Sequence, residues 1–401
     1  MSDYLPEEVV LEILYRLPVK SLIRFRCVSK SWNSLFTSSA FINSHLTRSL
    51  SLPSNSNKLI VRHYLAHSIV NYFKLIDDNN DSFDQIQNIE LPRRVQAYML
   101  IGSVNGLFSL YDQERYILWN PSIRKFITLP KPCSFIGLRR HAFGFDPRTN
   151  DYKVVRIAFP YQRNMSEEAK PPLIEVYSLN EGCWRITGAS FPPGIKVSNW
   201  SCPAAFLNGA VHFAAEYEYK PGGPCGPLVL SFNLLDEVFH VISLPNVTFE
   251  RTNNVHTSVI GGSLSLLFYY DRHADNKCCA IWVMKEYGVV DSWTKQFNVN
   301  LNRGVEITRV LGLQKNGNIL VEAILSRPPR CELSSYDPKS ERVKNLGICG
   351  SSYHFHVDNY MENLGLIDKP NETVFERRVS RKEEMQEGAS RKMWELLCME
   401  S

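Results

Sequence analysis

The period of the apolar residues changes near residue 50, and this change constrains the fold more than any other feature of the sequence. In LPEEVVLEILYRLP, near the start of the chain, Val9, Ile13 and Leu17 recur at helical spacing. From Lys58 onward, short runs of alternating apolar residues are separated by turn residues, which is the pattern of strands and hairpins. The sequence therefore predicts a mainly β protein with an all-α module at its N-terminal end.

The N-terminal module is expected to contain three to four short helices. Pro6 suits the first position of a helix, and Pro18 ends that helix because its ring clashes with the preceding turn and it lacks an N–H. A second helix follows in VKSLIRFRCVS, and Ser29 or Ser31 can cap a third helix that carries Trp32. The segment FINSHLTRSL fits one or two further helical turns.

A module of this size cannot bury all of its apolar side chains. Small domains bury a low fraction of their surface, and apolar residues lie on more than one face of each predicted helix. Two arrangements would cover the surplus: a partner protein bound to the helices, or the rest of this chain folded against them. The residues alone leave both arrangements open.

The strand region is expected to be a radial array of hairpins. Asn105-Gly106, Asn208-Gly209 and Asn316-Gly317 lie between apolar runs and predict tight turns. Segments such as LWNPSIRKFITLP and LSSYDPKSERVKNLG share the order strand, charged turn, strand. At about 40 to 50 residues for each four-stranded blade, this region predicts a β-propeller-like domain of about six blades. A large barrel or a pair of sandwiches is the alternative.

Charge and composition narrow the range of partners. The 45 Lys and Arg residues nearly balance the 41 Asp and Glu residues, and no basic stripe is present, so nucleic acid is not an expected partner. No apolar run reaches the roughly 18 residues of a membrane span, and acids stand where a secretory signal has basic residues. The ten cysteines are too sparse for a disulfide scaffold. We therefore expect an intracellular chain whose cysteines remain thiols.

No motif points to catalysis, a cofactor or a metal ion. Phosphate-binding glycine loops, HExxH and GxSxG are all absent from the sequence. His354 and His356 are spaced to face one side of a strand and could seat a metal ion, but packing or surface histidines are the favoured interpretation. The polar residues at 271–275 fit a turn, and the adjacent Cys278 and Cys279 point to opposite faces of a strand. We therefore predict no catalytic, cofactor-binding or metal-binding residue.

The segment LPEEVVLEILYRLPVKSLIRFRCVSKSWNSLFTSSAFINSH resembles the F-box over its whole length. Leu5-Pro6, Leu17-Pro18, Cys27-Val28-Ser29-Lys30 and Trp32 stand in the order typical of that family. The strand region resembles the F-box-associated, kelch-related interaction domain of plant F-box proteins, in phrases such as GSVNGLFSLYD, LWNPSIRKFITLP and FGFDPRTNDYKVVRI. The two resemblances together cover residues 5–350.

The resemblance implies a non-catalytic substrate receptor of an SCF (Skp–cullin–F-box) ubiquitin ligase, located in the cytoplasm or the nucleus. The helices would bind a Skp adaptor and through it a cullin, while the β domain would hold an unidentified target protein for ubiquitination. The adaptor-binding residues that the resemblance implies are Leu5, Pro6, Val9, Ile13, Leu17, Pro18, Leu22, Cys27, Val28 and Trp32. A propeller-fold enzyme and an RNA-binding or scaffold protein remain the alternatives.

The sequence thus predicts four parts. They are an F-box helical module at 1–48, a linker at 49–57, a propeller-like substrate-binding domain at 58–370 and a charged, partly helical tail at 371–401. Target specificity is expected in exposed, irregular segments of the β domain, because such loops carry binding residues on a rigid scaffold. The candidate segments are Arg139-Arg140, 162–170, 221–227 and 250–257.

Overall fold

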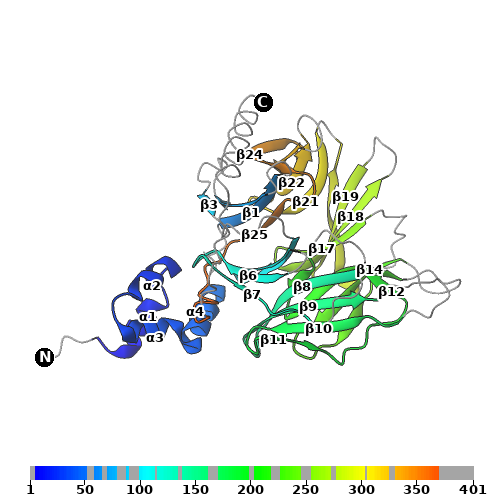
Figure 1. Cartoon of the computed structure of the whole chain (residues 1–401). Coiled ribbons are helices and arrows are strands. Elements are labelled where there is room, and N and C mark those ends of the chain that lie inside the picture. Colours follow the sequence, from blue (N-terminus) through cyan, green and yellow to red (C-terminus); the bar gives the residue numbers. More distant parts are fainter. Residues whose placement is uncertain are drawn as a thin grey trace, which may run out of the picture.

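The computed structural model describes residues 5–51, 58–65, 70–78, 87–89, 99–112, 115–133, 138–160, 170–197, 203–217, 226–244, 254–271, 277–302, 305–324 and 330–369. Within these residues the chain forms four helices followed by six β-sheets, which are the blades of a propeller. The helices lie together on one side of the β body (Figure 1). The predicted architecture, a helical module followed by a propeller of about six blades, is confirmed.

The helical module consists of α1 (Glu7–Leu14), α2 (Val19–Phe25), α3 (Lys30–Thr37) and α4 (Ser39–Ser51). Pro6 and Pro18 directly precede the first two helices. The Ser29 hydroxyl caps α3 by accepting a hydrogen bond from the backbone N–H of Trp32 at 3.1 Å. The fourth helix is longer than expected and runs into the segment 49–57, which the sequence predicts as a linker. Among the described residues, no helix is both long and apolar enough to cross a membrane.

Six antiparallel sheets follow, each of which forms one blade. Blade 1 contains β25 (His356–Asn359), β1 (Lys58–Leu65), β2 (Val70–Asp77) and β3 (Gln87–Ile89). Blade 2 contains β4 (Met99–Val104), β5 (Leu107–Tyr111), β6 (Tyr116–Asn120) and β7 (Lys125–Thr128). Blade 3 contains β8 (Leu138–Asp146), β9 (Asp151–Phe159), β10 (Leu173–Ser178) and β11 (Cys183–Ile186).

The remaining blades follow the same order along the chain. Blade 4 contains β12 (Ile195–Val197), β13 (Ala205–Leu207), β14 (Ala210–Tyr217), β15 (Pro227–Asn233) and β16 (Phe239–Ile242). Blade 5 contains β17 (Asn254–Ile260), β18 (Ser263–Asp271), β19 (Lys277–Met284) and β20 (Trp293–Asn300), with a short 3-10 helix, η2 (Val290–Ser292), before β20. Blade 6 contains β21 (Glu306–Leu313), β22 (Ile319–Ile324), β23 (Arg330–Tyr336) and β24 (Val343–Ser351).

The ring closes in blade 1, where strands from the two ends of the propeller meet. β25 pairs antiparallel with β1 and places His356 opposite Arg62 and Asn359 opposite Leu59. Without β25, one edge of β1 would present unpaired N–H and C=O groups. The propeller therefore needs residues from both ends of the domain to complete its fold.

Two of the three predicted Asn-Gly hairpins have the expected geometry. At Asn105-Gly106 and Asn208-Gly209 both residues have positive φ, as a two-residue type I′ turn requires. At the third, Gly317 has positive φ and its backbone N–H donates to the carbonyl of Gln314 at 3.0 Å. This is a longer hairpin loop, in which glycine takes the left-handed position.

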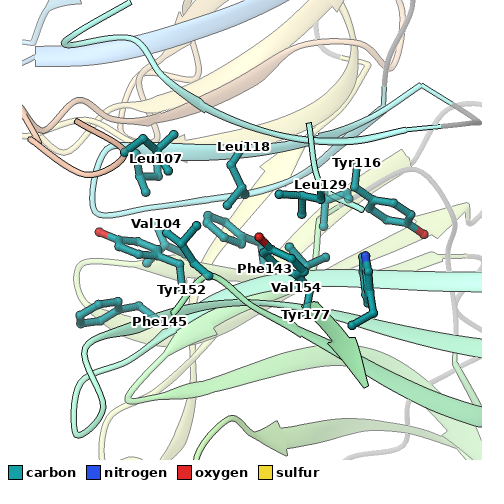
Figure 2. Packing of buried hydrophobic residues seen from close by; sticks show 14 of the residues in the cluster. Val104, Leu107, Tyr116, Leu118, Leu129, Phe143, Phe145, Tyr152, Val154 and Tyr177 are labelled. Carbon is teal, nitrogen blue, oxygen red and sulfur yellow. The ribbon is translucent and has the colours of Figure 1, made fainter. Parts of the chain in front are cut away.

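The hydrophobic core of the described propeller is divided into six clusters, one between each pair of neighbouring blades. Figure 2 shows the cluster between blades 2 and 3, where Leu107 and Leu118 lie over Phe143 and Val154. Each blade is covered on both faces, and every residue of β6 is buried. This explains why strands such as β6 are almost continuously apolar instead of alternating strictly.

The helical module contacts the propeller through the segment after β25. Leu364 and Ile367 of this segment, and Ile123 between β6 and β7, pack into the core of the module near Phe36. In the opposite direction, α4 inserts Leu46 into the cluster between blades 2 and 3. Figure 1 shows α4 as the helix nearest to β6 and β7. The module and the propeller therefore share apolar contacts on both sides of their junction.

Polar contacts of the same segment reinforce this junction. The Glu362 carboxylate accepts a hydrogen bond from the backbone N–H of Val19 at 2.7 Å. The Asn120 side-chain amide donates to the carbonyl of Asn363 at 2.8 Å, and the Asn363 side-chain amide donates to the carbonyl of Asn105 at 2.6 Å. The segment is thus tied to the helices and to blade 2 at once.

Candidate functional site

The helical module leaves apolar side chains exposed on one side of α1. Val9 and Ile13 lie four residues apart, which puts them on the same face of the helix. They are 43% and 47% exposed, and Leu5, just before the helix, is 61% exposed. Leu14 faces the core of the module and is 3% exposed. Apolar residues thus lie on two faces of α1, one covered by the chain itself and one open to solvent.

A second group of exposed residues lies between the end of α2 and the start of α3. Cys27 and Val28 are exposed there, Val28 at 66%. The nearby Trp32 is half-buried, and its ring packs edge-on against Phe25 and Phe36 with centroids 5.5 and 5.8 Å apart. Aromatic packing therefore supports this turn from beneath while Cys27 and Val28 face solvent.

The structure divides the ten predicted adaptor-binding residues by exposure. Leu22 is fully buried in the core of the module, and Leu17 and Trp32 are half-buried against it. The other seven are exposed: Leu5, Pro6, Val9, Ile13, Pro18, Cys27 and Val28. One of the two arrangements that the sequence left open therefore occurs for part of the apolar surface, which packs against the rest of the chain, while the other part stays exposed.

The inner strands of the propeller enclose a cavity of about 460 Å³. Its wall includes Ser103 from β4, Arg309 from β21, and His356 and Asp358 from β25. The Ser103 hydroxyl donates a hydrogen bond to the Asp358 carboxylate and lies 3.3 Å from Nε2 of His356. These three residues bring blades 1 and 2 together where the ring closes.

Ser103, His356 and Asp358 are not arranged as the relay of a serine hydrolase. In that relay the histidine takes the serine proton and the carboxylate bonds to the other ring nitrogen. Here the Asp358 carboxylate itself takes the serine hydrogen bond. Burial, together with the nearby charges of Arg62 and Arg309, lowers the pKa of His356 to about 3, while burial raises the pKa of Asp358. The contact joins β4 of blade 2 to β25 of blade 1.

The remaining polar residues that the sequence singled out do not come together. His354 is exposed and its ring lies against Tyr64, with centroids 4.8 Å apart. Burial raises the pKa of the Cys279 thiol, while its neighbour Cys278 is half-buried. Most of the segment 271–275 lies outside the described residues. Within the described part of the chain, no group of three or more His, Cys, Asp or Glu side chains could hold a metal ion.

Two of the four predicted target-binding segments are not irregular where the structure describes them. Arg139 and Arg140 lie inside β8, paired with Ala158 and Ile157 of β9, and Arg140 is 8% exposed. Two adjacent charges interrupt the apolar pattern of this strand, which made it resemble a turn. Residues 254–257 of the predicted loop 250–257 form the start of β17, and 250–253 lie outside the described residues. The segments 162–170 and 221–227 lie largely outside the described residues.

Sequence reasoning missed the segment 360–369 as a support for the helices. Its contacts with α2 and with the core of the module come from Glu362, Leu364 and Ile367. No motif marks this segment. The available signal is the pair Leu364 and Ile367, three residues apart just after the last strand, which is the spacing of a short docking turn.

Family models match both parts of the chain. A model described as the F-box domain matches residues 3–44, and a model described as the F-box associated beta propeller domain matches residues 66–368. The first match spans α1 to α3 and the start of α4, and the second begins between β1 and β2 and continues past β25.

Curated proteins of Arabidopsis thaliana are similar to this chain over most of its length. F-box protein At3g07870 is 27% identical, over 92% of this chain and 93% of its own. F-box/kelch-repeat protein At3g23880 is 30% identical, over 74% of this chain and 79% of its own. F-box protein CPR1 is 27% identical, over 87% of this chain and 86% of its own. The similarity therefore extends across the helices and the propeller together.

Proposed function

This chain belongs to the F-box proteins that carry an F-box-associated β-propeller domain, as its sequence motifs predict, and we propose that it is a substrate receptor of an SCF ubiquitin ligase. The helical module binds a Skp adaptor, which connects the chain to a cullin, and the propeller binds a target protein. The chain itself makes and breaks no bond. It raises the effective concentration of a target lysine near the ubiquitin-charged enzyme, in the cytoplasm or the nucleus and without nucleic acid or a membrane.

The exposed apolar face of the helical module carries this proposal. Val9, Ile13 and Val28 are exposed although the core beneath them is closed by Leu14 and Leu22. Exposed apolar side chains above a complete core are typical of a protein-binding surface. Because the core holds the helices in place without a partner, adaptor binding requires little ordering of the chain.

Several of these residues must contribute to the free energy of adaptor binding. Full burial of an exposed aliphatic side chain contributes about 1.5–3 kcal/mol. Val9 and Ile13 are already more than half covered, so each contributes about half of that amount. Association costs must also be overcome, and we therefore expect a charged substitution to disrupt binding much more than truncation to alanine.

The junction between the module and the propeller supports the proximity role. Leu364 and Ile367 fill the core of the module, and Glu362 bonds to the first residue of α2. These contacts fix the direction of the helices relative to the blades. A target bound to the propeller would then be held at a defined position relative to the adaptor, which is what catalysis by proximity requires.

The test is the affinity of the full chain for a purified Skp adaptor. Ile13→Asp places a carboxylate on the exposed face without entering the core, because Ile13 is 47% exposed. Burying that unpaired charge under the adaptor should weaken binding by about 30-fold or more. Val28→Asp should weaken binding in the same way. Both variants should keep the circular dichroism spectrum of the wild type.

A matched control places the same substitution on the propeller. Ile186, on β11, is 54% exposed, and Ile186→Asp should bind the adaptor as tightly as the wild type. Wild-type affinity in both Ile13→Asp and Val28→Asp would contradict the proposal. Equal loss of affinity in Ile186→Asp would also contradict it, because binding would then not depend on the helical face.

A further inference from the structure

A second cavity, of about 220 Å³, lies among the inner strands of the propeller and shares part of its wall with the larger cavity. Met99, Arg139 and Arg140 line it from the first halves of β4 and β8. Ser103, further along β4, lines the larger cavity, which also reaches Leu50 on α4. The small cavity therefore lies at the end of the inner strands away from α4.

The wall of this cavity carries positive charge. Arg139 and Arg140 contribute to it, and none of the described residues that line it is Asp or Glu. Nη1 of Arg139 donates to the Tyr111 hydroxyl at 2.6 Å, and Nη2 of Arg140 donates to the Val197 carbonyl at 3.4 Å. These bonds hold both guanidinium groups at the wall. Two cations beside one small cavity create a potential that favours an anion within it.

His141 lies in the same wall and adds no charge to it. Its Nε2 lies 2.8 Å from the Tyr116 hydroxyl, whose oxygen accepts a hydrogen bond from Arg156. Burial and the nearby arginines, Arg156 first, lower the pKa of His141 to about 3, so the ring is neutral at pH 7. The positive charge of the wall therefore comes from Arg139 and Arg140.

The rest of the cavity wall is largely apolar. Leu100, Ile101, Phe213 and Val255 line it. A cavity of about 150 Å³ is large enough to hold a benzene ring, so this one can hold a compact apolar group beside an oxyanion. Such a wall, mostly apolar with a few placed polar groups, is typical of a small-ligand site.

We propose that this cavity binds a carboxylate or phosphate group carried on a small apolar or aromatic body. Arg139 and Arg140 balance the charge of the ligand. The oxyanion comes from a free small molecule or from an acidic or phosphorylated side chain of a target protein, and the same groups recognise both. All of the described residues that line the site belong to the propeller. The proposed anion site can therefore be tested independently of adaptor binding.

The test uses calorimetric titration of the full chain with benzoate, phenyl phosphate and the uncharged benzyl alcohol. The two anions should bind, and benzyl alcohol should bind at least about tenfold more weakly because it lacks the charge. Arg139→Gln should weaken anion binding by about tenfold or more. Arg139→Lys keeps the positive charge and should retain more affinity than Arg139→Gln. Arg148→Gln, at an exposed position after β8, should bind as the wild type does.

Capped amino acids distinguish the two sources of the anion. Binding of acetylated, amidated phosphotyrosine or glutamate indicates a protein side chain, and binding of the free anions alone indicates a small molecule; both outcomes support the site. The proposal is overturned if neither benzoate nor phenyl phosphate binds, if benzyl alcohol binds equally well, or if Arg139→Gln binds as the wild type does. Adaptor affinity of Arg139→Gln should be unchanged, which separates this site from the proposed receptor function.

Discussion

The carboxylate of Glu362 accepts a hydrogen bond from the backbone N–H of Val19 at 2.7 Å, although the two residues are 343 positions apart in the chain. The first N–H groups of a helix have no partner within that helix. The segment that follows the last propeller strand supplies this partner for α2. The bond therefore couples the orientation of the helical module to the propeller.

Removing this bond should loosen the start of α2. Glu362→Ala leaves the N–H of Val19 without its acceptor and should destabilise the helix by about 1 kcal/mol, as loss of a cap does. Glu362→Gln keeps a side-chain oxygen and should cost less. Hydrogen exchange of the backbone amides at the start of α2 measures the effect. The control is Glu286→Ala at an exposed position in blade 5. If the amides at the start of α2 exchange as slowly in Glu362→Ala as in this control, the bond does not stabilise the helix.

Ser103→Ala should weaken the closure of the ring. The substitution removes the hydroxyl that bonds to Asp358 and leaves the carboxylate with the backbone N–H of Asn359 as a donor. Loss of a hydrogen bond to a charged group costs about 1–3 kcal/mol. Burial already raises the pKa of Asp358, and loss of the hydroxyl raises it further. The deficit in unfolding free energy should therefore be larger at pH 7 than near pH 5, because protonation of the carboxylate removes the charge that the hydroxyl stabilises.

Urea denaturation at the two pH values measures this deficit. The matched control is Ser44→Ala on an exposed position of α4, which should change the unfolding free energy by less than about 0.5 kcal/mol at either pH. A Ser103→Ala deficit that equals the control at pH 7 would show that the contact between β4 and β25 does not stabilise the ring.

His212 should make the propeller less stable in acid. The residue is fully buried; its Nδ1 donates to the Ala205 carbonyl at 3.1 Å, and its Nε2 accepts from the Tyr287 hydroxyl at 2.8 Å. Burial lowers its pKa from 6.5 to about 4. Between these two values the unfolded chain binds the proton that the folded chain excludes, so the contribution of His212 to stability falls as the pH decreases through this window.

The comparison of the wild type with His212→Gln isolates this effect, because glutamine does not titrate. The stability advantage of the wild type over the variant should shrink by about 2 kcal/mol between pH 7 and pH 5. Urea denaturation of both proteins at both pH values measures it. An advantage that is the same at pH 7 and pH 5 would be inconsistent with a neutral, buried His212.

Truncations should reveal which part of the C-terminal region the propeller needs. A chain that ends at Lys369 keeps β25 and the segment that supports the helices, and should melt at the same temperature as the full chain. A chain that ends at Phe355 lacks β25, leaves the edge of β1 unpaired, and should fail to form a stable monomer. Thermal melting and size-exclusion chromatography measure both outcomes. Equal behaviour of the two truncated chains would disprove the closing role of β25.

The features of the fold that local chemistry determines were predictable from the sequence. The change in period near residue 50 separates helices from strands, and Asn105-Gly106 fits a turn that needs two positive φ angles. Ring closure was not predictable in this way. β25 has only four residues, it is half-buried to exposed, and its partner β1 lies about 300 residues earlier. Nothing in the local pattern of such a strand indicates its partner.

Which apolar side chains of the helical module are buried and which are exposed also depends on residues that are distant in the sequence. Leu22 and Ile13 are both apolar and both lie at helical spacing, so the sequence treats them alike. Leu22 is fully buried and Ile13 is 47% exposed because Leu364 and Ile367, from the other end of the described chain, complete one side of the core. The sequence also did not predict that Arg139 lies in a strand. The charged pair Arg139-Arg140 lines a cavity and interrupts the apolar pattern by which a strand is usually identified.

The most direct test of adaptor binding uses Cys27, an exposed thiol within the surface proposed for the adaptor. Alkylation of the full chain, followed by mass spectrometry of each cysteine, compares Cys27 with Cys133 and Cys183, which are exposed on the propeller. We predict that a saturating Skp adaptor reduces the alkylation of Cys27 to a small fraction of its rate in the free chain and leaves the rates of Cys133 and Cys183 unchanged. An unchanged rate at Cys27 while the adaptor is bound would contradict the central claim that the adaptor covers this face of the helices.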